Sequence, residues 1–96
     1  MRHRQEQSIT DLTFQFLRRE GLETPLNEYR LMAAWSDMVG KRTAMASRNM
    51  FIRNEKLFVE IDNPVIRQEL MMRRTSLLSR LNSIVGTRVI TDIIIR

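Results

Sequence analysis

The chain has 96 residues without a cysteine, and its 16 Lys and Arg residues against 11 Asp and Glu residues give a net charge of +5. This length fits one domain, residues 1–96, and the missing cysteines exclude disulfides, a thiolate nucleophile and a cysteine-based zinc site. The positive charge comes almost entirely from arginine and favours a nucleic-acid or acidic-protein partner, although solubility alone also explains a charge of this size.

The N-terminal stretch, residues 1–8, is polar and leads into no apolar segment. We therefore expect no secretory signal peptide, and we expect residues 1–7 to form a disordered tail. No apolar run approaches the roughly 20 residues that cross a bilayer, so we predict no membrane partner and a cytoplasmic location.

Two helices are predicted in the first half of the chain. Ser8 or Thr10 is placed to cap the first helix, and Gly21, followed by Pro25, is placed to end it. The second runs from about residue 26 to 39. Its apolar stripe at helical spacing comprises Leu31, Met32, Trp35, Met38 and Val39.

The end of the second helix carries the only tryptophan, a glycine and a basic pair. Trp35 lies on the apolar stripe, so we expect it in the core. Gly40 either ends the helix or lets a further turn depart at an angle, in a backbone conformation that a side chain would obstruct. Lys41 and Arg42 are expected on the surface past a helix C-terminus, where the macrodipole favours cations. There they could join a basic patch.

From about residue 49 the hydrophobic period changes from helical to alternating. Leu57, Val59 and Ile61 alternate with mostly polar residues, which predicts a strand with one buried face. Residues 50–52 predict a preceding strand, joined to the next by Asn54 and Glu55. We expect a hairpin here, although the favoured two-residue turn has glycine where Glu55 stands.

A long third helix is predicted after the hairpin, opened by Asn63 as cap and Pro64 at its first position, and stopped by Gly86. Residues 88–96 are rich in β-branched side chains and predict a final strand. One face of that strand is expected to carry Val89, Thr91, Ile93 and Ile95. The order is α-α-β-β-α-β, with the last two strands as parallel neighbours through a crossover. We predict an α+β domain with a three-stranded sheet packed against helices.

The residue types of common catalytic and metal sites are scarce. His3 is the only histidine, so no histidine-based triad or metal cluster can form. The three glycines all stand at predicted helix ends, which leaves no Gly-rich phosphate loop. Glu60, Asp62 and Glu69 are near one another in sequence, but we interpret them as solvated charges. We predict a non-enzyme without cofactor, metal or small-molecule substrate.

The arginines of the predicted third helix fall within or beside its apolar arc. They either extend along the edges of the core with their heads in water, or form a basic margin that binds phosphate or an acidic partner. The first interpretation suits Arg73 and Arg80 at one edge, but it suits Arg67 and Arg74 poorly because they interrupt the arc. The candidate nucleic-acid or partner-binding residues are Lys41, Arg42, Arg48, Arg67, Arg73, Arg74 and Arg80.

Several segments together resemble the bacterial DciA family over about residues 26–96. They are WSDMVG (35–40), NEKLFVEI (54–61), RQEL (67–70), LLSRLN (77–82) and the Ile-rich end. The residues that carry this signature are Trp35, Gly40, Leu57, Leu70, Leu81 and Asn82. The chain departs from the family pattern twice: Ser47-Arg48-Asn49 stands where the family has Thr-x-Pro, and Asn54-Glu55 stands where it has Asn-Gly.

This resemblance implies a KH-like fold and a role in chromosome replication. The expected partners are the DnaB-type replicative helicase, which the protein would help to load, and single-stranded DNA, with RNA as an open alternative. No nucleotide site is implied. The chain lacks the GXXG loop with which KH domains clamp nucleic acid. A small KH-like RNA-binding or ribosome-associated module and an adaptor that binds only protein remain the alternative hypotheses.

Overall fold

A computed structural model describes residue 15 and residues 21–96. The predicted first helix, apart from residue 15, and the predicted tail lie outside these residues. The helices and strands, in chain order, are α2 (Glu23–Ala33), α3 (Trp35–Val39), α4 (Lys41–Ala46), β1 (Ser47–Arg53), β2 (Lys56–Ile61), α5 (Pro64–Met72), α6 (Arg74–Val85) and β3 (Asp92–Ile95).

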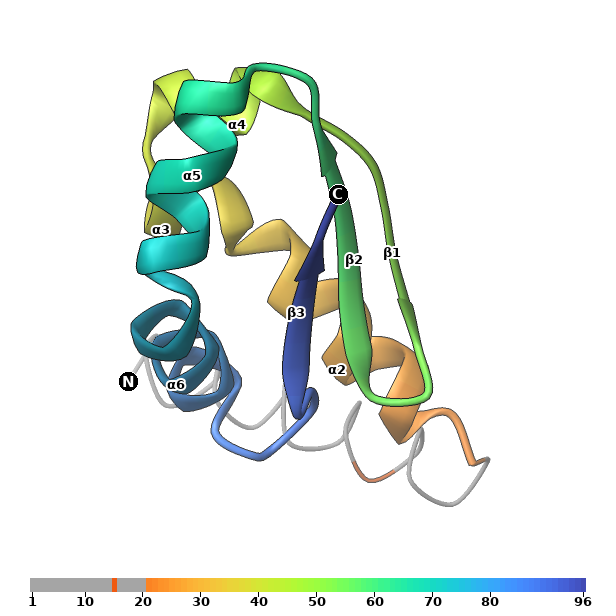
Figure 1. Cartoon of the computed structure of the whole chain (residues 1–96). Coiled ribbons are helices and arrows are strands. Elements are labelled where there is room, and N and C mark those ends of the chain that lie inside the picture. Colours follow the sequence, from red (N-terminus) through yellow and green to blue (C-terminus); the bar gives the residue numbers. More distant parts are fainter. Residues whose placement is uncertain (1–14, 16–20) are drawn as a thin grey trace.

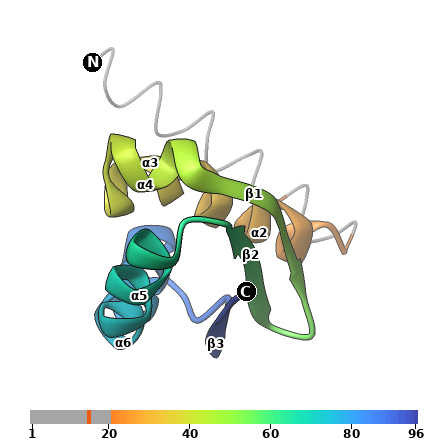
Figure 2. The same cartoon turned by 45° about the horizontal axis from the view of Figure 1, so that its top comes forward.

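The strands form one sheet in the order β1-β2-β3, with β1 antiparallel and β3 parallel to β2. Helix α2 passes behind the sheet, and α5 and α6 lie to its side next to α3 and α4 (Figures 1 and 2). No helix of the described part covers the near face of the sheet in Figure 1. The predicted α+β class and the parallel pairing of the last two strands are confirmed.

The predicted hairpin is confirmed, and it turns without a glycine. Arg53 pairs with Lys56, so Asn54 and Glu55 alone make the turn, at φ of 52° and 62°. Two successive left-handed residues are the geometry of a type I′ turn, whose twist matches that of the strands. The carbonyl of Glu55 accepts hydrogen bonds from the backbone N–H (2.6 Å) and hydroxyl (3.1 Å) of Thr91. The residue before β3 therefore holds the turn in place.

The second predicted helix is divided into α2 and α3, and α4 follows it after Gly40. It begins at Glu23, earlier than predicted, because Pro25 lies in the first turn, where a missing N–H costs no helical hydrogen bond. Gly40, at φ 92° and ψ 160°, lets α4 depart, which confirms the second of the two alternatives. A Cβ there would meet nothing within 4 Å, so the demand for glycine is one of backbone dihedral alone.

The long third helix was predicted as one element, and this is wrong. Asn63 does cap it, accepting from the N–H groups of Val65 and Ile66, and Pro64 follows as predicted. At Arg73, however, the backbone (φ −95°, ψ 1°) leaves helical geometry and separates α5 from α6. The Arg73 guanidinium donates to the carbonyls of Met38 (3.0 Å) and Val39 (3.4 Å) at the end of α3. This tertiary contact accompanies the break.

The core lies between the sheet and the helices. Its fully buried side chains are Leu31, Leu57, Ile61, Leu70, Leu77, Leu81, Ile90, Ile93 and Val59. Trp35 is 3% exposed and packs with them, as predicted. Its indole N–H donates to the Ser47 hydroxyl (3.0 Å), which donates in turn to the Thr43 carbonyl (2.8 Å). This chain of hydrogen bonds ties α3 to the start of β1.

The final strand is shorter than predicted and begins at Asp92. Ile93 lies on the core side as expected, but Thr91 is exposed. The strand starts late because Asn82 binds the backbone of residues 89–90 and holds them as an irregular segment. Its carbonyl oxygen accepts from the N–H groups of Val89 (2.9 Å) and Ile90 (3.1 Å), and its amide donates to the Ile90 carbonyl (2.9 Å).

Candidate nucleic-acid interface

The predicted signature residues build the fold. Leu57, Leu70 and Leu81 are buried in the core. Trp35 joins α3 to β1, and Asn82 fixes the segment before β3. All the signature residues except Gly40 are at least partly buried, so the candidate binding surface lies among the other exposed side chains.

Two of the predicted basic residues are engaged by the protein itself. Arg67 donates to the Ile61 carbonyl at 2.7 Å, where β2 ends, and Arg73 donates to the carbonyls at the end of α3. Their grouping along one apolar arc depended on a continuous third helix, and the helix is broken at Arg73. Both guanidinium groups satisfy backbone acceptors that the ends of β2 and α3 would otherwise leave open.

Three other predicted residues form ion pairs at the surface. Arg42 lies 3.5 Å from Glu69, Arg48 2.6 Å from Asp62, and Arg74 3.8 Å from Asp92. The arginine side chains in these pairs are between 48% and 67% exposed. Exposed pairs of this kind contribute about 0–1 kcal/mol, so the arginines can exchange their partners for a ligand.

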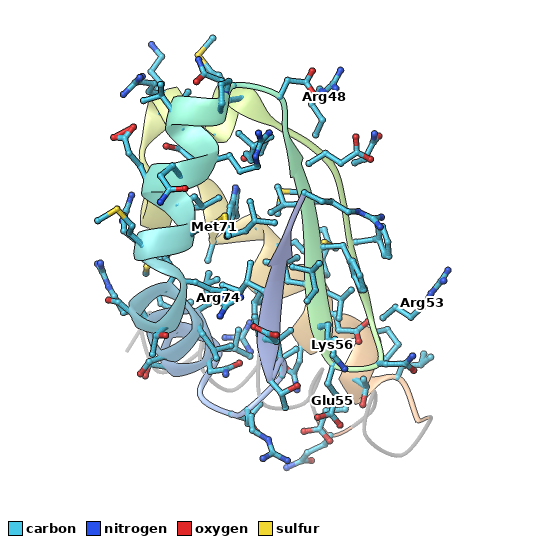
Figure 3. The ribbon with its side chains drawn as sticks, viewed as in Figure 1. Arg48, Arg53, Glu55, Lys56, Met71 and Arg74 are labelled. Carbon is cyan, nitrogen blue, oxygen red and sulfur yellow. The ribbon has the colours of Figure 1, made fainter. Side chains whose placement is uncertain are left out.

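Lys41 and Arg80 are exposed on α4 and α6. Lys41 and Arg42 follow the end of α3, as predicted, but they also open α4, and an N-terminus disfavours cations. The predicted basic residues therefore come from several elements: α4, β1, α5, α6 and the break between α5 and α6. Figure 3 shows two of them far apart, with Arg48 near the top of the hairpin and Arg74 beside the lower part of β3.

A different group of side chains meets on the uncovered side of the sheet. Because Leu57 and Val59 of β2 point into the core, Phe58 between them points the other way. Phe58 pairs with Phe51 on β1 and with Ile94 on β3, so these side chains form a row across all three strands. We call this side the open sheet face; the row is flanked by Arg48, Arg53, Lys56 and Arg96.

The aromatic pair at the centre of the open sheet face is stacked. The rings of Phe51 and Phe58 have centroids 4.7 Å apart and planes inclined by 9°. The guanidinium carbon of Arg96 lies 5.8 Å from the Phe51 centroid and 5.2 Å from the Phe58 centroid, and that of Arg53 lies 5.6 Å from Phe51. These distances are those of cation–π contacts.

A β-bulge brings Arg48 to the same face. The pairing register between β1 and β2 shifts between Arg48 and Phe51, where Asn49 has φ 51°. Residues three apart in a regular strand point to opposite sides, and the extra residue reverses this. The proline of the family pattern could not take the positive φ of Asn49. The departure from Thr-x-Pro is thus a change of backbone geometry.

Sequence reasoning did not select Phe51, Arg53, Phe58 or Arg96 as site residues. One signal for them was present, since Phe58 occupies a solvent-side position in the alternation of β2. The partner of Phe58, however, depends on the hairpin register and on the bulge. Neither can be read from residue types alone.

Neither a metal-binding cluster nor a membrane-spanning helix is found in the part of the chain that the structure describes. No cluster of three or more metal-ligating side chains occurs there. Among the helices of residues 21–96, none combines the length and hydropathy needed to cross a bilayer.

The fold and surface define a small α+β domain with a helix-backed sheet whose other face exposes paired aromatics and arginines. The chain belongs to the DciA family: the family model described as "Dna[CI] antecedent, DciA" matches residues 8–95. The match extends further towards the N-terminus than the resemblance that begins near residue 26. No curated protein gives a significant match to the chain. The family is a bacterial one, associated with loading of the DnaB replicative helicase.

Proposed function

We propose that this protein is a non-enzymatic accessory factor of DNA replication that engages the DnaB-type helicase and assists its loading on single-stranded DNA. The family match over residues 8–95 carries this proposal, because it spans nearly the whole chain. The net charge of +5 supports it, since a helicase loader works beside a polyanion.

The mechanism we propose is one of binding alone. A domain that holds a single strand and the helicase together raises the local concentration of each for the other. Exposed arginines supply long-range attraction to phosphates, which increases the rate of encounter. We propose that residues 1–96 do this as one domain.

Retention by the purified helicase tests the proposal. The host's replicative helicase is immobilised and exposed to this protein at micromolar concentration, first at low and then at physiological salt. A basic protein of similar size and charge serves as control, because charge alone can hold a cation on an acidic surface. We expect retention of this protein and loss of the control at physiological salt. Equal behaviour of the two proteins would refute helicase engagement.

Crosslinking in cells separates this function from the RNA-binding alternative. Bound nucleic acid is recovered after irradiation and sequenced. We expect more chromosomal DNA in the recovered material than in material prepared in the same way from cells that lack the protein. Predominant recovery of ribosomal or other structured RNA would contradict a replication role and support the alternative.

A further inference from the structure

We propose that single-stranded DNA binds across the open sheet face, with bases stacked on Phe51 and Phe58 and phosphates held by Arg53 and Arg96. This inference rests on the proposed function in taking a single strand as ligand. It goes further by assigning a surface and a mode of contact. It places the site on the sheet, whereas most of the basic residues predicted from the sequence lie on helices.

The first argument is the geometry of the aromatic pair. Phe51 and Phe58 are adjacent across the hairpin, nearly parallel, and only partly buried. A base can extend such a stack because every base has a π-face. Stacking of a base on an aromatic side chain contributes about 1–3 kcal/mol and tolerates any sequence.

The second argument is the position of the arginines. Arg53 and Arg96 hold their guanidinium groups 5.2–5.8 Å from the ring centroids. A base that stacks on these rings carries its phosphate a short distance away, within reach of the same flexible side chains. Arginine grips phosphate with two parallel hydrogen bonds. One small area thus offers both interactions that a single strand requires.

The third argument is the charge of the whole face. Basic side chains reach it from every strand: Arg48 and Arg53 from β1, Lys56 from β2, and Arg96 at the end of β3. Three carboxylates offset them: Glu60 and Asp92 share the face, and Asp62 is paired with Arg48, as Asp92 is with Arg74. The surplus is positive, which complements a polyanion.

A purely structural role for the aromatic pair predicts something different. Cross-strand aromatic pairs stabilise hairpins by about 0.2–1 kcal/mol without any ligand. Such a role would make substitutions of Phe51 affect stability and leave DNA affinity unchanged. The cation–π contacts of Arg53 and Arg96 are compatible with that role as well, so DNA-binding measurements have to separate the two roles.

The test measures binding of a fluorescently labelled oligothymidine by anisotropy over a range of salt concentrations. Phe51→Leu removes the aromatic ring but keeps an apolar side chain and leaves the net charge of the protein unchanged. We expect it to weaken binding about tenfold at an unchanged salt slope, since only stacking is lost. Arg53→Gln combined with Arg96→Gln should lower the slope of log affinity against log salt by about 1.4, because each phosphate contact contributes about 0.7.

The matched control is Lys41→Gln combined with Arg80→Gln, which removes the same charge from α4 and α6. We expect its salt slope to stay within error of wild type. Circular dichroism melting confirms that each variant is folded at the assay temperature. Wild-type affinity in folded Phe51→Leu, or equal slopes for the two charge variants, would overturn the assignment.

Retention on the helicase separates this inference from the proposed function. Folded open-face variants that lose DNA but stay on the helicase support both. A wild-type protein that binds the helicase and no single strand refutes the open-face assignment alone. A protein that binds DNA through this face but never binds the helicase refutes the helicase role alone.

Discussion

Single side chains hold this fold together at points where regular structure stops. Asn82 is the clearest case, because its amide makes three hydrogen bonds to the backbone of Val89 and Ile90. The segment before β3 has no strand partner of its own, and an asparagine has both the acceptor and the donor that it needs. The Leu81-Asn82 signature therefore has a physical reason: one residue fills the core and the next fixes the chain that returns to the sheet.

Replacing Asn82 by alanine is expected to destabilise the protein by about 2–3 kcal/mol, since partly buried backbone groups lose their partners. Ser83→Ala, at the exposed neighbouring position, should change stability by less than about 0.5 kcal/mol. Urea unfolding measures both. Asn82→Asp keeps the acceptor oxygen, so its loss of stability should lie between the losses of these two variants. Equal stability of the alanine variant and wild type would show that the hydrogen bonds are not needed.

Arg67 and Arg73 are predicted to act on stability, because both donate to main-chain carbonyls of the protein. Arg67→Gln and Arg73→Gln should each lower the free energy of unfolding by about 1–2 kcal/mol, the usual range for hydrogen bonds from charged donors. Neither should change the salt slope of DNA binding. Arg80→Gln is the control for loss of charge. A changed slope with unchanged melting temperature would favour the basic margin, which is one of the two interpretations that the sequence left open.

At the scale of elements, the residue types predicted which segments are helices and strands better than where they break. The alternation of Leu57, Val59 and Ile61 and the cap at Asn63 are local features, and both predictions were confirmed. The break at Arg73 has no proline or glycine to announce it. It coincides with a contact to α3, thirty-five residues away in sequence, which local propensity does not contain.

The conformation of the hairpin turn predicts how a substitution at Glu55 changes stability. Glu55 has φ 62°, a conformation that costs a non-glycine residue about 1–2 kcal/mol, partly offset by the greater entropy that glycine loses. Glu55→Gly should therefore stabilise the protein, by up to about 1 kcal/mol. Thermal unfolding measures the change, and the carbonyl that Thr91 binds is retained.

Gly86→Ala tests the same backbone effect in the reverse direction, because it removes a glycine from a positive φ. Gly86 ends α6 at φ 94°, and a Cβ there would meet nothing within 4 Å, so only the dihedral is tested. We expect a loss of about 1 kcal/mol. If both substitutions moved stability in the same direction, the left-handed backbone would not be the cause.

At the scale of the whole molecule, the α+β class, the core position of Trp35 and the family followed from sequence because each depends on patterns along the chain. The open sheet face did not. Phe51, Phe58, Ile94 and Arg96 come together only through the antiparallel register, the bulge and the parallel pairing with β3. The net charge indicated a polyanionic partner. It did not indicate which surface binds that partner, since arginines are spread over most elements.

The most direct test of the account is a loading assay. Replicative helicase is mixed with single-stranded DNA, with and without this protein, and the helicase bound to DNA is measured after a fixed time. We predict that wild type increases loading and that Phe51→Leu with Arg53→Gln reduces the increase severalfold, although both proteins are retained by the helicase. Lys41→Gln with Arg80→Gln should load as wild type does. No increase with the wild-type protein would contradict the proposed function, and full loading by the folded open-face variant would contradict the proposed surface.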